Sequence, residues 1–340
     1  MTNYLAVFLI AFVVAIAMTP VAIRLSSRWG VMAVPGGRRR HGRIVPKLGG
    51  IPIFLAYFAG IVVIYTVLPP AGNDALRLRG VIIGSFIFLI GGLIDDFREL
   101  SPWAQFGIQF VGAAIAMAHI VFIEIFTNPI NGDLVTISWR PLVYLITLVW
   151  IVGIINSVNF LDGLDGLAAG VGTIAALLFA WHSLRLGQEA VAAFPLALAG
   201  ALLGFLPYNF APAKIFLGTA GAYVLGYNLA TLSILSPAKI ATALLVLAIP
   251  IVDGVWRAID RLRKGRSPFH GDRGHLHFRL VDEGIPIRWI ILGYYGISLS
   301  FGLIALFAPG LLKLVLLVLL GGLVLALLVA LSYRVDRRDH

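Results

Sequence analysis

The sequence predicts an all-α polytopic membrane protein with about 11 transmembrane helices. Its 340 residues are 60% hydrophobic, only 12% are charged, and the apolar residues gather in long runs. A globular protein carries roughly 25% charged residues, and a helix needs about 20 apolar residues to cross a bilayer. The composition therefore excludes a disordered chain, a fibrous repeat and an ordinary soluble enzyme. The chain has no cysteine, which also excludes thiol catalysis, thiolate metal sites and a disulfide scaffold.

The apolar runs define the expected spans in chain order. These spans are 4–23, 49–68, 81–96, 104–123, 141–158, 166–184, 190–208, 219–235, 238–256, 289–308 and 311–332. The first run is too long for a signal peptide and lacks a small-residue cleavage site, so we expect a retained helix. No internal repeat and no long linker is visible, which favours a single membrane domain over residues 1–340.

The charged residues predict the orientation. With 11 spans, one side of the membrane receives 20 of the 26 Lys and Arg residues and 12 of the 16 Asp and Glu residues. The excess of basic residues marks the cytoplasmic side, which puts the amino terminus outside and the carboxyl terminus in the cytoplasm. The cytoplasmic loops are then about 24–48, 95–103, 156–165, 208–219 and 257–288. Contact with anionic lipid accounts for much of this charge, and no nucleic-acid partner is expected because no soluble domain presents a groove.

Two acidic or amide clusters end unusually short apolar runs. Residues 81–94 precede Asp95 and Asp96, and residues 141–155 precede the stretch Asn156–Asn159. Helices of these lengths reach only about 21 and 22 Å, short of the roughly 30 Å apolar layer. We therefore expect both helices to continue into their polar residues. The alternative is a helix-end carboxylate that reaches the headgroups, but charge at such a depth usually marks a pathway or a site.

The next cluster is Asp162-Gly163-Leu164-Asp165-Gly166. The glycines allow a turn and the close approach of a ligand, and Asp162 and Asp165 would share a face if the turn were helical. Asp and Asn oxygens suit magnesium, which is commonly held by one or two carboxylates together with substrate phosphates. A polar turn is the alternative. Together with Asp95 and Asp96, the cluster predicts a metal–phosphate site.

The last cytoplasmic loop combines His270, Asp272, Arg273, His275 and His277. Arginine binds phosphate oxygens through two parallel hydrogen bonds, and histidine can donate a hydrogen bond or move a proton near neutral pH. We therefore predict a diphosphate-binding loop. A zinc site is the competing interpretation, and the missing cysteines and the spacing of the histidines disfavour it.

These motifs, taken in order, resemble the polyprenyl-phosphate N-acetylhexosamine-1-phosphate transferases over essentially the whole chain. The matching stretches are Arg38-Arg39-Arg40-His41, Pro46 with Gly49-Gly50, Asp95 to Leu100 with Gln109, Asn156 to Gly166, Tyr208-Asn209, Phe216-Leu217-Gly218 and His270 to His277. The family includes the enzyme that starts peptidoglycan lipid intermediates and enzymes that start O-antigen, enterobacterial common antigen and teichoic acid linkage units. The first and last cytoplasmic loops are similar to the branch that uses UDP-N-acetylglucosamine. The UDP-MurNAc-pentapeptide branch usually has a run of adjacent histidines in the last loop.

The resemblance implies transfer of N-acetylglucosamine 1-phosphate from UDP-N-acetylglucosamine to undecaprenyl phosphate, with UMP released, at the cytoplasmic face of a bacterial inner membrane. It implies a Mg²⁺ cofactor, with Mn²⁺ as a substitute, and membrane lipid as a partner; homo-oligomerisation is left open. The catalytic residues would be Asp95 and Asp96. Asp95 would be the base or would position the lipid phosphate, Asp96 would lie nearby at the metal, and a covalent aspartyl intermediate is left open. The metal residues would be Asp96, Asp162, Asp165 and position 219; the nucleotide residues Asn156, Asn159, Asp162 and Asn209; and the phosphate or sugar residues Arg39, His41, His270, Arg273, His275 and His277.

One position departs from the family pattern. The family motif F-x-G-D-x-G has a metal-binding aspartate, whereas the sequence here is Phe216-Leu217-Gly218-Thr219-Ala220-Gly221. Threonine is neutral and a much weaker metal ligand. Three explanations are open: an engineered replacement, a natural variant that uses another carboxylate, or a chain that has lost catalysis. A non-catalytic binder of lipid phosphate or nucleotide sugar is therefore one rival hypothesis. A transporter is another, although transporters hold their polar residues near the membrane midplane.

Overall fold

A computed structural model of the chain describes residues 2–34, 44–235, 237–265, 267 and 274–338. Over these residues the protein is almost entirely helical. The helices are α1 (Thr2–Trp29), α2 (Gly50–Val67), α3 (Gly72–Arg98), α4 (Pro102–Ala118), α5 (Arg140–Leu161), α6 (Leu167–Arg185), α7 (Glu189–Asn209), α8 (Gly218–Ile234), α9 (Pro237–Val246), α10 (Ala248–Arg263), α11 (Leu276–Asp282), α12 (Ile287–Phe307) and α13 (Gly310–Arg338). The predicted all-α class is confirmed.

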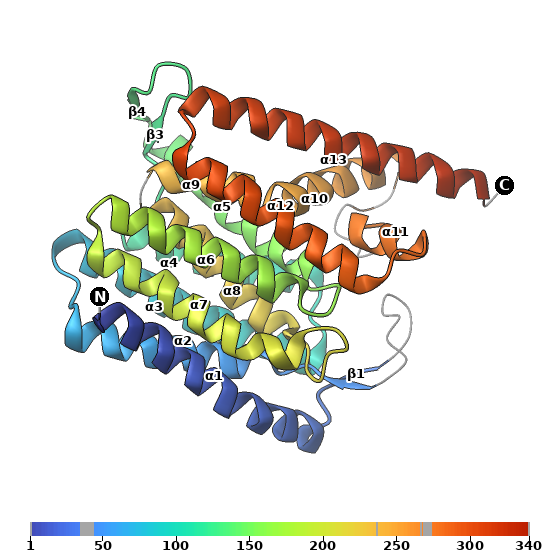
Figure 1. The fold of residues 1–340 in the computed structure, drawn as a ribbon, viewed down its shortest axis with the longest axis horizontal. Helices are drawn as coiled ribbons and strands as arrows, with labels where there is room; N and C mark the ends of the chain where they lie inside the picture. Colours follow the sequence, from blue (N-terminus) through green and yellow to red (C-terminus); the bar gives the residue numbers. More distant parts are fainter. Residues whose placement is uncertain (1, 35–43, 236, 266, 268–273, 339–340) are drawn as a thin grey trace.

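Two short antiparallel hairpins interrupt the helices. The first pairs β1 (Met32–Ala33) with β2 (Val45–Pro46), and the second pairs β3 (Ile125–Thr127) with β4 (Leu134–Thr136). They lie at opposite ends of the helix bundle (Figure 1). Helix α1 begins at the end that carries β3 and β4, and α13 ends on the side of α11 (Figure 1). The predicted placement of the two termini on opposite sides of a membrane, with the carboxyl terminus in the cytoplasm, stays a prediction.

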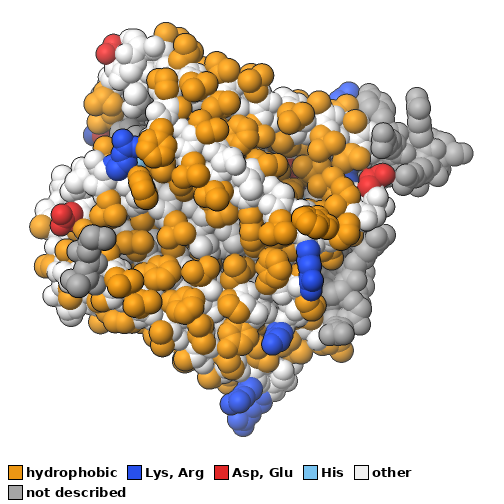
Figure 2. Space-filling view, in the orientation of Figure 1, with side chains coloured by type: hydrophobic (Ala, Val, Ile, Leu, Met, Phe, Trp, Pro, Cys, Tyr) orange, Lys and Arg blue, Asp and Glu red, His pale blue; other side chains and the backbone are white. Residues whose placement is uncertain are grey.

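Every predicted span contains a helix. Of the described helices, eight are long and apolar enough to cross a membrane, or nine if the bent pair formed by α9 and α10, with an angle of 73°, is one broken span. Helices α4 and α8 have 17 residues each, shorter than the other candidates. The side chains on one face of the molecule are mostly hydrophobic, with few charged groups among them (Figure 2). The protein is thus a multi-pass membrane protein, and the number 11 stays a prediction.

Some predicted helix boundaries were wrong. Helix α3 begins at Gly72, nine residues before the expected span. Its first turns can include the charged residues Asp74 and Arg77 because both side chains remain accessible. Nη1 of Arg77 lies 3.7 Å from Oδ1 of Asp74. The other end of α3 continues through Asp95 and Asp96, as expected. The expected span 238–256 is broken at Leu247, and α10 then continues to Arg263. Hydropathy alone recognises neither a helix that leaves the apolar layer nor a bend inside it.

Helix α8 lies at the centre of the bundle and fixes the position of the polar segments. It contacts α2, α3, α5 and α9, and all of its residues from Ala220 to Ile234 are buried. Its first turn packs closely against the start of α2, since a Cβ at Gly50 would lie 2.5 Å from the backbone nitrogen of Gly221. Small residues let membrane helices approach in this way. The beginning of α8 is therefore held tightly beside the ends of α2 and α3.

Candidate active site

A cavity of about 1860 Å³ opens at the end of the bundle opposite the β3–β4 hairpin. All five predicted cytoplasmic loops contribute to its wall, among them Lys47, Asp95, Asp162, Thr219 and His275. Small-ligand pockets usually measure about 300–1,000 Å³, so this cavity has room for a ligand of considerable length. The structure thus brings together the motifs that the sequence separates by more than 200 residues.

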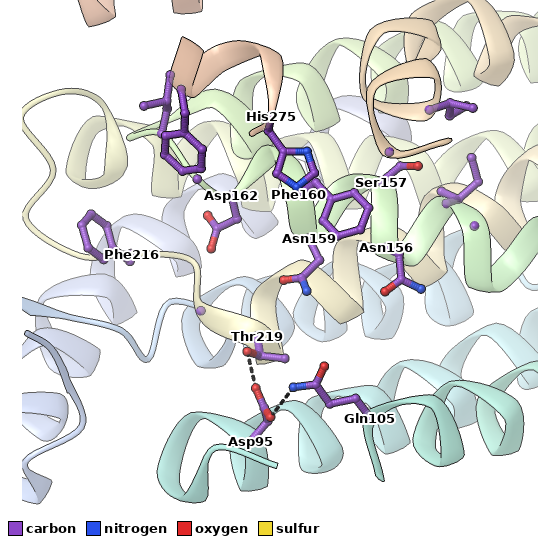
Figure 3. A pocket seen from close by; sticks show the side chains of 18 of the residues that line it. Asp95, Gln105, Asn156, Ser157, Asn159, Phe160, Asp162, Phe216, Thr219 and His275 are labelled. Atoms are coloured by element: carbon purple, nitrogen blue, oxygen red, sulfur yellow. Dashed lines mark hydrogen bonds between the residues drawn. The ribbon is translucent and has the colours of Figure 1, made fainter. Parts of the chain in front are cut away.

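Asp95, near the end of α3, joins three segments through its carboxylate. Its Oδ1 accepts hydrogen bonds from the backbone N–H of Leu100 at 2.9 Å and from Nε2 of Gln105 at 2.8 Å. Its Oδ2 accepts one from the hydroxyl of Thr219 at 2.6 Å (Figure 3). Asp95 is 7% exposed and lines the cavity. Among the described residues, the donors that hold this carboxylate are all neutral.

Asp96 holds the first turn of α8. Its two carboxylate oxygens accept hydrogen bonds from the backbone N–H groups of Thr219 at 3.0 Å and Ala220 at 3.1 Å. Such N–H groups have no partner inside their own helix, and the helix dipole favours a negative charge beside them. Gly218, just before them, has a φ of +73°, and a Cβ there would lie 2.8 Å from Asp96 Oδ2. Only glycine fits this close approach.

The predicted Asp162–Asp165 cluster forms a turn between α5 and α6, not a helical turn. Both carboxylates line the cavity, and Asp165 Oδ2 accepts a hydrogen bond from the backbone N–H of Ala213 at 2.8 Å. Asp162 lies on the wall opposite Thr219 (Figure 3). The two acids therefore reach one cavity from the same turn, but they do not share a helix face.

The three predicted amide ligands have different surroundings. Asn156 and Gln109 form a reciprocal pair, with Nδ2 of Asn156 donating to Gln109 Oε1 at 2.8 Å, and Asn156 also donates to the carbonyl of Val152. Asn209 is 2% exposed and donates to the carbonyl of Ile215 at 2.9 Å, which fixes the loop before α8. Asn159 points into the cavity (Figure 3) and makes no hydrogen bond with the described residues. Asn159 is thus the amide most available to a ligand.

The two described histidines of the last loop are both buried but not equivalent. His275 lines the cavity and stacks on Phe160, with ring centroids 4.7 Å apart. His277 does not line it; a Cβ at Gly163 would lie 2.5 Å from its Nε2. Burial, and then the neighbouring His275, lower the pKa of His277 to about 3. His277 is therefore a neutral packing residue in this structure, and its predicted phosphate contact has no support from its position.

Four predicted phosphate or sugar residues lie outside the described part of the chain. They are Arg39, His41, His270 and Arg273. Their roles stay predictions from the sequence.

Two charged residues of the site were not predicted. Lys47 is 8% exposed, lines the cavity beside Asp96, and forms no ion pair with any described residue. Asp253, on α10, is 2% exposed and accepts a hydrogen bond from the ring of His275. Asp253 lies inside the expected span 238–256, and an acid within an apolar span is by itself a signal of function. Nothing in the sequence around Lys47 distinguishes it from the other basic residues of its loop.

The oxygen donors of the site suit a hard cation only in part. Asp95, Asp96, Asp162 and Asp165 line one cavity, and carboxylates with substrate phosphates are the usual magnesium ligands. In the part of the chain that the structure describes, however, no group of three or more His, Asp or Glu side chains could hold a metal alone. The residues therefore fit a magnesium ion that takes most of its ligands from a bound phosphate and water.

The far wall of the cavity is apolar. Helix α5 contributes Leu145, Val149 and Trp150, and the bent pair α9–α10 contributes Leu244 and Ile251. Val149 is 63% exposed in a part of the molecule that has the composition of a membrane span. The cavity thus extends from charged groups to apolar residues of helices that have the composition of membrane spans.

Comparison with known proteins gives a consistent family. The model described as glycosyl transferase family 4 matches residues 78–237. A probable undecaprenyl-phosphate N-acetylglucosaminyl 1-phosphate transferase of Bacillus subtilis is 32% identical over 314 residues, covering 90% of this chain and 85% of the relative. A decaprenyl-phosphate N-acetylglucosaminephosphotransferase of Mycobacterium tuberculosis is 32% identical, covering 84% and 77%. An undecaprenyl-phosphate alpha-N-acetylglucosaminyl 1-phosphate transferase of Haemophilus influenzae is 32% identical, covering 86% and 82%.

Proposed function

The chain belongs to glycosyl transferase family 4, and on that premise we propose that it transfers N-acetylglucosamine 1-phosphate from UDP-N-acetylglucosamine to undecaprenyl phosphate. The observation that carries the proposal is the two-ended cavity. Carboxylates, an amide and Lys47 line one end, and apolar residues of α5, α9 and α10 line the other. A lipid phosphate has an anionic head and an apolar tail, and this cavity offers a suitable surface to each. The names of the relatives favour N-acetylglucosamine over the UDP-MurNAc-pentapeptide branch.

In the proposed reaction, an oxygen of the lipid phosphate forms a bond to the phosphorus that carries the sugar. The bond between this phosphorus and the bridging oxygen breaks, and UMP leaves with that oxygen. The lipid phosphate is already ionised, so the main tasks of the protein are to position the reactants and to offset their charge. Asp95 would orient the attacking phosphate, and the Lys47 ammonium would offset its charge.

Magnesium, when bound, supplies the charge neutralisation that phosphoryl transfer requires. Asp96 would hold it, with Asp162 and Asp165 as supporting groups from the opposite wall. Asn159 would bind the nucleotide, because its amide points into the cavity without a partner among the described residues. Because the backbone N–H groups of α8 already orient the Asp96 carboxylate, it needs little rearrangement to receive a cation.

A transfer assay with radiolabelled UDP-N-acetylglucosamine, undecaprenyl phosphate and Mg²⁺ tests the proposal. The natural chain, Thr219→Asp and the exposed control Thr66→Asp should be compared after purification in one detergent. We expect lipid-linked product from the natural chain and an increase with Thr219→Asp alone. Absence of product in all three folded proteins would contradict the transferase assignment.

A second candidate is a binder without catalysis, and one contact favours it. The Thr219 hydroxyl donates to Asp95 Oδ2, so that the threonine ties up a carboxylate oxygen rather than adding a metal ligand. Product formation by the natural chain would eliminate this candidate. Product only after Thr219→Asp would support it and would identify position 219 as the missing ligand.

We further propose that the cavity opens to the cytoplasm at the inner membrane of a bacterium. The excess of basic residues on this side supports that orientation. The chain has no cysteine, so single cysteines can be introduced without further changes. In intact cells, an impermeant thiol reagent should label Asn131→Cys at the β3–β4 hairpin and spare Arg98→Cys at the end of α3. Labelling of Arg98→Cys but not of Asn131→Cys would show the opposite topology.

A further inference from the structure

The contact between Asp253 and His275 carries an inference that rests on the proposed function and deepens it. Asp253 belongs to α10, and His275 precedes the first residue of α11. Nδ1 of His275 lies 3.0 Å from Asp253 Oδ2, and the backbone N–H of Leu276 donates to Asp253 Oδ1 at 3.1 Å. One carboxylate thus holds both the ring and the backbone of the segment that enters the cavity wall.

Burial makes this pairing energetically necessary. Asp253 and His275 are each 2% exposed, and an unpaired buried carboxylate would be strongly unfavourable. An ionised carboxylate only accepts hydrogen bonds, so the proton of the contact must be on Nδ1. Asp253 therefore determines which ring nitrogen of His275 carries a proton.

The other ring nitrogen is left for a ligand. Nε2 of His275 has no hydrogen-bond partner in the described structure, although it is buried and the residue lines the cavity. Stacking on Phe160 fixes the plane of the ring, and His275 lies across the cavity from Asp95 and Thr219 (Figure 3). A buried polar atom without a hydrogen-bond partner costs free energy, and a ligand group that pairs with it removes this cost.

We propose that Asp253 is a positioning residue that holds the proton of His275 on Nδ1, so that the lone pair of Nε2 is left to accept a hydrogen bond from a hydroxyl or N–H group of the nucleotide-sugar substrate. Asp253 does not itself contact the substrate; it acts through His275. The same contact attaches α11 to α10, so the experiment has to separate the orientation of the His275 ring from this structural role.

The test separates these two roles with Asp253→Asn. The asparagine Oδ1 can still accept a hydrogen bond from the backbone N–H of Leu276. Its amide N–H then donates to Nδ1 of His275, which favours the tautomer with the proton on Nε2. We expect ¹⁵N-histidine NMR to show a protonated Nδ1 at His275 in the natural chain and an unprotonated one in the variant. Calorimetry with UDP-N-acetylglucosamine should show an affinity loss of about tenfold to hundredfold, because Nε2 would then carry a proton and could no longer accept the hydrogen bond from the ligand.

A control and a double variant complete the design. Asp260→Asn alters another buried acid of α10, which pairs with Arg257 at 2.8 Å, and should leave both the tautomer and the affinity unchanged. Asp253→Asn combined with His275→Gln should bind no more weakly than His275→Gln alone, because the two residues act as one unit. Additive losses would overturn the proposal.

Three other results would overturn it as well: an unprotonated Nδ1 in the natural chain, normal UDP-N-acetylglucosamine affinity in folded Asp253→Asn, or normal affinity in His275→Gln. If Asp253→Asn fails to fold, the proposal is still tested by the His275 tautomer in the unaltered chain and by the UDP-N-acetylglucosamine affinity of His275→Gln. All these readouts are independent of turnover. Loss of the transfer reaction with intact nucleotide-sugar binding would count against the proposed function alone.

Discussion

Two buried acidic corners flank the same cavity, and they differ in what holds their charge. At the α3–α8 corner, every group in the described part of the chain that donates to Asp95 or Asp96 is neutral, among them Thr219 and Ala220. At the α10–α11 corner, Asp253 is paired with the imidazole of His275. Among the described residues, the first corner thus has no charged hydrogen-bond donor, whereas the second has a histidine ring as its partner. Under the proposed function, the first corner would receive a cation and the second would orient the side chain of His275.

The largest effect is expected at the α3–α8 corner. Asp95→Asn removes the charge but nearly preserves the shape, and we expect turnover to fall by about 10²–10³-fold because the reacting phosphate loses its positioning group. The transfer assay measures this. Asp74→Asn, at the other end of the same helix, is the matched control. If the two variants were equally active, the α3–α8 corner would have no role in the chemistry.

The next effect concerns stability at the α10–α11 corner. His277 has its pKa lowered to about 3, so it is neutral when folded but takes up a proton on unfolding below about pH 6.5. Its stabilising contribution is present above pH 6.5 and is lost as the pH falls toward 3. At pH 5 the loss amounts to about 2 kcal/mol. His277→Leu should reduce the drop in melting temperature between pH 7 and pH 5, and an unchanged drop would contradict the assigned neutral state.

A smaller effect is expected from the cation beside the α3–α8 corner. Lys47→Met should raise the KM for undecaprenyl phosphate about tenfold, since one charge-assisted contact is lost, and should leave the KM for UDP-N-acetylglucosamine nearly constant. Steady-state kinetics with each substrate varied in turn measure both values. Lys313→Met, far from the cavity wall, serves as the control. A rise only in the KM for UDP-N-acetylglucosamine would show that Lys47 contacts the nucleotide sugar instead of the lipid phosphate.

The smallest effect is expected at the apolar wall, away from both corners. Gly153 on α5 lines the cavity, and a side chain there would meet no atom within 4 Å. Gly153→Trp should fold normally and raise the KM for the lipid acceptor about fivefold by occupying apolar surface that the tail would cover. Gly293→Trp on α12, equally open but outside the cavity, is its control. An equal KM for the lipid acceptor in the two variants would show that the apolar wall does not bind the acceptor.

The sequence predicted the bundle well because hydrophobic length is the main requirement for crossing a membrane. It also predicted that Asp95, Asp162 and Thr219 would come together, and the structure places all three on one cavity. Which side chains reach the cavity depends on packing, which sequence patterns do not contain. His277 looks equivalent to His275 in the sequence, yet only His275 reaches the cavity. The difference arises from contact with Gly163, a residue more than 100 positions away.

The two unpredicted residues show the same limit in different ways. Lys47 cannot be distinguished from neighbouring basic residues in the sequence, whereas in the structure it is buried, with its backbone beside Gly218 at the start of α8. The position of Asp253 within an apolar run indicates a functional residue. Its partner His275, however, lies 22 residues further along, beyond the end of α10. Their contact joins α10 to the start of α11, and hydropathy does not predict such a contact between segments.

The most direct test of the central claim is the stoichiometry of the products. The natural chain and Thr219→Asp would be incubated with UDP-N-acetylglucosamine, undecaprenyl phosphate and Mg²⁺, and lipid product and UMP would be quantified by mass spectrometry. We predict undecaprenyl-diphosphate N-acetylglucosamine and UMP in equal amounts, with more of both from Thr219→Asp. UMP without the lipid product, or neither product from either folded protein, would contradict the proposed transfer.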